Sequence, residues 1–162
     1  MFEVLQEFIN SIPPLLKWLA VLLASMIPFV ESDSGSIMGI VSGLNPVVAI
    51  GSAVAGNVLS MLAVVFLADG VRSKLVGVKE AGAKEAKPLS PRRVKLREKF
   101  DKYGVVGVSL LGPTILPSQF TSAAMVSFGA AKNVVILWQV IAIIMWGVAV
   151  GSIATIGVSF LR

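Results

Sequence analysis

The sequence of 162 residues has no cysteine, no histidine and little charge, since only 14% of its residues are Asp, Glu, Lys or Arg. The missing cysteine and histidine exclude disulfides, haem and iron–sulfur ligation, Cys or His nucleophiles and the usual zinc sites. A soluble domain carries about 25% charged residues to cover its surface. The low charge therefore excludes an ordinary soluble enzyme, a secreted scaffold and a disordered chain.

Apolar residues dominate what remains. They make up 56% of the chain, and its mean hydropathy is +0.87. This composition indicates a multi-pass integral membrane protein that lies in the lipid bilayer. No constellation of residues typical of catalysis or of cofactor or metal binding emerges, so we expect a protein that is not an enzyme and has no cofactor.

Positive charge is concentrated in residues 70–102, which hold eleven of the fourteen basic residues and four acids. A basic loop between hydrophobic blocks follows the positive-inside rule. We therefore expect loop 70–102 in the cytoplasm and the protein in the cytoplasmic (inner) membrane. Aromatic residues do not interleave these charges, so nucleic acid is not an expected partner.

Charge-free runs define the expected spans. A helix rises about 1.5 Å per residue and the hydrocarbon core is about 30 Å thick. Spans are expected over 14–30, with Lys17 snorkelling to the interface, over 46–68 and over 133–161. Breaks at 43–46, at 112–113 and at Pro117 leave 35–44, 104–111 and 118–131, which are too short to cross.

Short, interrupted segments that precede full spans are typical of inverted-repeat transporters. We expect an all-α fold of two inverted repeats, each a re-entrant hairpin plus a full transmembrane helix, with an extra N-terminal span. The internal alignment sets 34–56 against 121–143. One membrane domain then has halves 1–70 and 103–162 joined by the loop 71–102. The alternative is four plain spans with proline kinks.

Two amphipathic helices flank the spans. Residues 2–12 place Phe2, Leu5, Ile9 and Ile12 on one face. Residues 91–103, ended by Gly104, are expected to lie on anionic lipids of the cytoplasmic leaflet, whereas 76–90 have the composition of a mobile linker. A purely topogenic charge run is the alternative for 91–103.

The first candidate site is the acidic cluster Glu31, Asp33 and Ser34. Ionised carboxylates are costly in hydrocarbon, so they face water or protein and mark a pathway. If 35–43 is a half-length helix, Asp33 or Ser34 is its N-cap. The alternative is that Asp33 only caps this helix while Glu31 lies in an aqueous loop.

The second candidate site is the polar segment after Pro113, with Ser118, Gln119 and Thr121. Unwound backbone and these side chains could bind a cation or a head group, and Asn57 adds an amide inside the second span. We expect this segment to meet Glu31 and Asp33 near the midplane, where desolvation raises the pKa of a carboxyl group. A capped helix start at Ser118 or Thr121 is the alternative.

Small residues repeat at four-residue spacing at Gly35, Gly39 and Gly43, and again at Gly147 and Gly151. Such spacing lets helices approach closely, either within the chain or in a homodimer. Interhelical hydrogen bonds explain Asn57 and Gln139 as well as substrate contact does.

The order of these motifs resembles a known family. Glu31 follows the first span, Gly56-Asn57 lies in the second, and Tyr103-Gly104, Gly107 and the Pro113–Pro117 segment follow. Over 31–155 this order resembles the small multidrug export protein family. That family is similar to the DedA (VTT-domain) membrane proteins, so the resemblance implies two re-entrant hairpins that meet in the membrane.

The chain departs from this family at three places. Ser32-Asp33-Ser34 stand where an Arg is common, Ser118-Gln119-Phe120 stand where Gly-Thr-Gly is common, and the second hairpin has no arginine. A site that keeps acids without basic partners suits cations better than lipid phosphates. We therefore expect an ion- or proton-coupled exporter of small or cationic compounds. The alternatives are a DedA-like translocase of phospholipid or polyprenyl phosphate and a non-transporting scaffold or assembly factor.

Overall fold

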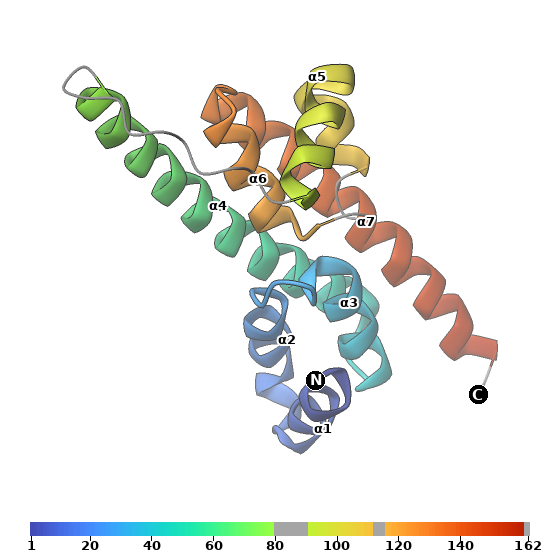
Figure 1. Ribbon diagram of the computed structural model, residues 1–162. Helices are drawn as coiled ribbons and strands as arrows, with labels where there is room; N and C mark the ends of the chain where they lie inside the picture. Colours follow the sequence, from blue (N-terminus) through green and yellow to red (C-terminus); the bar gives the residue numbers. More distant parts are fainter. Residues whose placement is uncertain (80–90, 112–115, 161–162) are drawn as a thin grey trace. The chain divides into compact units, whose positions relative to one another are not determined.

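The computed structural model describes residues 1–79, 91–111 and 116–160, and every regular element in these ranges is helical (Figure 1). The elements are α1 (Phe2–Ser11), η1 (Pro14–Leu16), α2 (Lys17–Ser25), α3 (Glu31–Val41), α4 (Pro46–Lys79), α5 (Pro91–Leu111), α6 (Ser118–Ser127) and α7 (Lys132–Phe160). The all-α prediction is thereby confirmed for the described part of the chain.

The chain divides into two compact units. The first unit comprises Met1–Ser60 and Val140–Arg162, and the second unit comprises Met61–Gln139. Helices α1, α2 and α3 belong to the first unit, whereas α5 and α6 belong to the second. The two long helices each contribute residues to both units.

Two described helices are long and apolar enough to cross a membrane. They are Pro46–Val71 within α4, with 26 residues, and Lys132–Phe160, with 29 residues. At about 1.5 Å per residue each exceeds the 30 Å or so of a hydrocarbon core. These two helices correspond to the spans predicted over 46–68 and 133–161. Helix α4 continues to Lys79, which includes the start of the predicted 76–90 linker, whose residues 80–90 lie outside the described residues.

The predicted N-terminal span over 14–30 is wrong. Its helix ends at Ser25, so the apolar helix Pro14–Ser25 rises only about 18 Å. Pro28 has no N–H to continue the helical hydrogen bonds, and Phe29 adopts a left-handed conformation with φ 75°. The chain therefore turns after α2 and enters a second short helix, α3.

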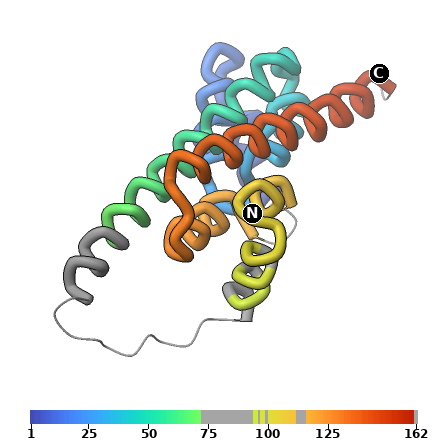
Figure 2. Tube along the Cα trace, turned by 90° about the horizontal axis from the view of Figure 1, so that it is seen from above, coloured from blue at the N-terminus to red at the C-terminus, as the bar shows by residue number. Residues whose placement is uncertain are grey.

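Helices α2 and α3 form an antiparallel hairpin in the first unit. Lys17 at the start of α2 donates from Nζ to the Ser42 carbonyl after α3, at 2.9 Å. At the other end, a Cβ on Gly35 would collide with the Ser25 side chain. Figure 2 shows these short helices gathered together in blue and cyan. The small residues therefore serve close packing within the chain.

Helix α1 packs onto this hairpin. Ile9 is fully buried in a core with Val21 and Met38, and Leu5 and Ile12 pack against this core. These three residues lie on the predicted apolar face of the helix. Gln6 donates from Nε2 to Ser42 Oγ at 2.6 Å, which fixes α1 beside the end of α3.

Helix α7 packs antiparallel to α4 within the first unit. A Cβ on Gly147 would lie 2.9 Å from Val54, and a Cβ on Gly151 would lie 2.5 Å from Ile50. Residues that come later in α7 therefore meet residues that come earlier in α4. The second small-residue pair thus also packs inside the chain.

A local hydrogen-bond pattern recurs after 86 residues. Ser36 Oγ donates to the Ser32 carbonyl at 2.5 Å, and Ser122 Oγ donates to the Ser118 carbonyl at 2.6 Å. The turn that follows each helix contains a glycine with positive φ, Gly43 at 85° and Gly129 at 110°. The same backbone bond closes both turns, Leu44 N to Gly39 O and Ala130 N to Met125 O.

Burial recurs in the same register along the two long helices. The buried residues of α4 and their counterparts in α7 are Ala49 and Val135, Ala53 and Gln139, Gly56 and Ala142, Asn57 and Ile143, Met61 and Gly147, and Val65 and Gly151. The predicted alignment of 34–56 with 121–143 is therefore displaced by one residue, because 34–56 correspond to 120–142. Repeated small and apolar residues match at neighbouring registers, so identities alone could not determine the alignment.

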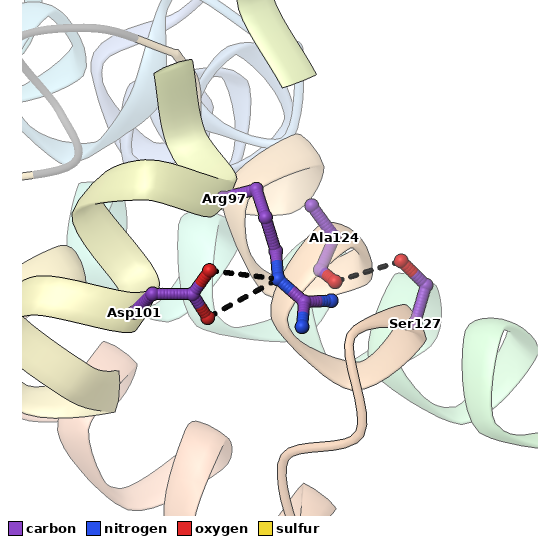
Figure 3. A network of polar contacts seen from close by, with 4 residues as sticks. All are labelled: Arg97, Asp101, Ala124 and Ser127. Carbon is purple, nitrogen blue, oxygen red and sulfur yellow. Dashed lines mark hydrogen bonds and ion pairs between the residues drawn. The ribbon is translucent and has the colours of Figure 1, made fainter. Parts of the chain in front are cut away.

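The second unit contains the break predicted at Gly104. Helix α5 covers the predicted 91–103 helix, and its backbone leaves the helical region at Gly104 (φ 65°, ψ −168°) before continuing to Leu111. Phe100 packs against Phe128 after α6, with ring centroids 5.7 Å apart. Arg97 lies over the same ring. It also pairs with Asp101 on its own helix, as Figure 3 shows.

Candidate functional site

The acidic cluster lies where the hairpin turns. Two residues other than glycine adopt left-handed conformations there, Phe29 with φ 75° and Glu31 with φ 51°. Each costs about 1–2 kcal/mol relative to the right-handed region, and such strain concentrates at functional sites. Glu31 is 9% exposed and opens α3. The sequence contains no glycine signal at this turn, so its conformation could not be predicted.

Asp33 and Ser34 lie within the first turn of α3, so the predicted N-cap at these residues is wrong. The helix begins at Glu31, and its N-cap is Val30, which makes no side-chain bond. The Asp33 carboxylate accepts a hydrogen bond from the Ser34 N–H at 2.8 Å. Both acids stand at the N-terminal end of the helix, where its dipole stabilises negative charge by about 0.3–1 kcal/mol.

Ser32 connects this turn to α7. Its Oγ donates to the Ile143 carbonyl at 3.0 Å, within the first unit, and the side chain is buried. Ser32 was not among the predicted site residues, although it lies between the two acids of the cluster. Asn57, the predicted amide inside α4, is also buried in this unit.

A cavity of about 610 Å³ lies between α1 and α3. Its lining residues are Phe2, Glu3, Gln6, Glu7, Ser34, Ile37 and Met38. The lining therefore combines apolar walls with two carboxylates from α1 and the predicted site residue Ser34. Glu3 and Glu7 were not among the predicted site residues, although the amphipathic spacing of residues 2–12 places them off the apolar face.

The second polar cluster forms the first turn of α6. Ser118, Gln119 and Thr121 are all buried, as is Ser122. Ser118 Oγ lies 3.5 Å from Gln119 Oε1, and Thr121 Oγ1 donates to the Leu116 carbonyl at 3.2 Å. The N-cap is Pro117 without a side-chain bond, so the capping alternative at Ser118 or Thr121 is wrong. Pro113, Thr114 and Ile115 lie outside the described residues.

By the 86-residue recurrence, the polar cluster at the start of α3 and the polar cluster at the start of α6 occupy corresponding positions. Ser32 corresponds to Ser118, and Asp33 corresponds to Gln119. The first turn of α3 therefore carries carboxylates where the first turn of α6 carries neutral groups. The Glu31 cluster belongs to the first unit and the Gln119 cluster to the second. That the two clusters lie close together in space therefore remains a prediction.

Metal-binding geometry is absent from the described ranges, which contain no group of three or more Asp and Glu side chains that could hold a metal ion. Comparison of the chain with protein-family models, with characterised proteins and with solved structures finds no match. The function must therefore be argued from the geometry above.

Proposed function

We propose that the chain is a multi-pass protein of the cytoplasmic membrane that exports small or cationic compounds, driven by protons or ions. The observation that carries the proposal is the acidic cavity of the first unit. Its lining combines apolar residues with Glu3 and Glu7 of α1, and it includes Ser34, which lies in the first turn of α3 with Glu31 and Asp33. Apolar surface next to carboxylates complements an organic cation, which has both an apolar body and a positive charge.

The recurrence after 86 residues supports an architecture of two inverted repeats. Each copy would comprise a short-helix hairpin and one long helix, either α4 or α7. The antiparallel packing of α4 and α7 in the first unit has the direction that inverted repeats require. The hairpins would be re-entrant, because α2 and α3 are each too short to cross a membrane. This architecture is the one that the resemblance to the small multidrug export and DedA families implies.

The mechanism assigns proton coupling to the acids of α3. A carboxyl group at membrane depth can exchange a proton for a substrate cation, and a proton gradient then drives export. Glu31 is the stronger candidate, because it is buried and its backbone is strained. Asp33, Ser34, Asn57, Ser118, Gln119 and Thr121 would supply the remaining polar contacts.

Proteoliposomes with an imposed pH gradient test the proposal, with tetraphenylphosphonium as the cation. We expect gradient-driven transport by the native chain, and Glu31→Gln should abolish the coupling while the protein still inserts. Glu3→Gln combined with Glu7→Gln should weaken cation binding. The control is Glu98→Gln on α5, an exposed acid far along the chain from the cavity, which should transport as the native chain does.

The same vesicles distinguish the alternatives. Flipping of a fluorescent phosphatidylethanolamine without cation transport would overturn the exporter in favour of a lipid translocase. Vesicles that neither transport nor flip would indicate a scaffold. Transport that is unchanged in Glu31→Gln would refute the proton-coupling role even if export occurs.

A further inference from the structure

Two side chains of the second unit bury polar atoms that have no hydrogen-bond partner. Gln139 on α7 and Ser109 on α5 are fully buried. Neither the Nε2 and Oε1 atoms of Gln139 nor the Oγ atom of Ser109 has a partner. The large majority of buried side-chain polar atoms in proteins are paired. Gln139 is the stronger exception, because it leaves both a donor and an acceptor unpaired.

The fold does not require a polar residue at position 139. The recurrence pairs Gln139 with Ala53, and Ala53 Cβ lies 3.1 Å from where a Cβ on Gly35 would stand. In the first unit, the position that corresponds to Gln139 is therefore filled by a small residue, Ala53, which packs beside Gly35. In the second unit the counterpart of Gly35 is Thr121, which is also fully buried. Since an alanine suffices for the same backbone pattern at position 53, this pattern alone does not account for an amide at position 139.

The amide of Gln139 is itself uncharged and fully buried, which favours an uncharged ligand. The buried polar side chains described for the second unit are Ser109, Ser118, Gln119, Thr121, Ser122 and Gln139. All of them are neutral, and a buried ion without a counter-charge is costly. A carboxamide donates through Nε2 and accepts through Oε1 at the same time. A matching ligand therefore carries a donor and an acceptor on one uncharged group.

We propose that Gln139 binds an uncharged polar group that both donates and accepts hydrogen bonds, such as a primary carboxamide or a protonated carboxylic acid. Gln139 is 0% exposed in this structure, so binding requires the second unit to open. The unpaired amide disfavours the closed form, and a ligand that satisfies it shifts the population toward the open form. This site does not depend on transport or on Glu31.

Equilibrium dialysis of radiolabelled benzamide against the purified full chain tests the proposal. Benzoate is the matched probe, because it has nearly the same shape but is ionised at neutral pH. We expect saturable benzamide binding, at least tenfold weaker benzoate binding, and at least a tenfold loss of benzamide affinity in Gln139→Leu. Equal affinity for the two probes, no saturable benzamide binding, or unchanged affinity in Gln139→Leu overturns the proposal.

Thermal unfolding separates a binding role from a structural one. Gln139→Leu removes two unpaired polar atoms at similar volume, so the unfolding midpoint should rise by roughly 2–8 °C. Gln119→Leu is the matched control, since Gln119 is also buried but lies within reach of Ser118 Oγ. Its midpoint should fall. A lower midpoint in Gln139→Leu would reveal a structural partner for the amide and overturn the proposal.

Discussion

Lys132 Nζ lies 2.7 Å from Asp69 Oδ2, so the start of α7 is joined to α4 within the second unit. The ammonium group also lies 5.8 Å from the centroid of the Phe66 ring. The pair is partly shielded, with 42% and 33% of the two side chains exposed. This shielding distinguishes it from the more exposed pair Arg97–Asp101 on α5, with 45% and 58% exposed.

The first prediction concerns the strength of this ion pair. A double-mutant cycle with Asp69→Asn and Lys132→Gln should give a coupling energy of about 0.5–1 kcal/mol, because solvent still screens both groups. The same cycle at Arg97 and Asp101 should give less than about 0.5 kcal/mol, as is usual for exposed pairs within one helix. Thermal unfolding at low and high salt measures both. A coupling at Arg97–Asp101 equal to that at Asp69–Lys132 would contradict the prediction.

The second prediction compares two glycines of α4. A Cβ on Gly56 would collide with the backbone carbonyl of Leu22, whereas a Cβ on Gly51 would meet nothing within 4 Å. Gly56→Ala should therefore destabilise the protein by about 1–3 kcal/mol, because backbone cannot move aside cheaply. Gly51→Ala should stabilise it by up to about 1 kcal/mol through helix propensity. Equal unfolding midpoints for the two variants would show that α2 does not pack against α4 in this way.

The third prediction concerns the proposed re-entrant hairpin. Because the chain has no native cysteine, single cysteines at Leu15 and Gly43 report sidedness without background. Both positions are exposed and lie at the open end of the α2–α3 hairpin. A membrane-impermeant maleimide should label both from the outer side of intact cells. Labelling from opposite sides would mean that the segment crosses the membrane once.

The fourth prediction concerns orientation. Residues 70–102 hold most of the positive charge, so the positive-inside rule predicts that they lie in the cytoplasm. A green fluorescent protein inserted after residue 85 should therefore fluoresce, and alkaline phosphatase at the same position should be inactive. Active phosphatase there would reverse the orientation of every span.

Much of the local structure could be predicted from the sequence, because it depends on properties of single residues and short runs. Pro46 starts α4 and Gly104 breaks α5 as expected, since proline lacks an N–H and glycine tolerates positive φ. The lengths of the apolar runs similarly identified α4 and α7 as the long helices. The acidic and neutral clusters were recognised because polar residues are rare among such apolar neighbours.

Only the tertiary structure determined which residues of these helices contact one another. Residues 14–30 do not form one helix, because the left-handed turn at Phe29 lets Gly35 pack against Ser25. The cavity acids Glu3 and Glu7 depend on where α1 docks, and the lack of a partner for Gln139 depends on everything around it. Such features arise from contacts between residues distant in the sequence. In a chain this rich in small apolar residues, many alternative contacts look alike until packing and hydrogen bonds select one.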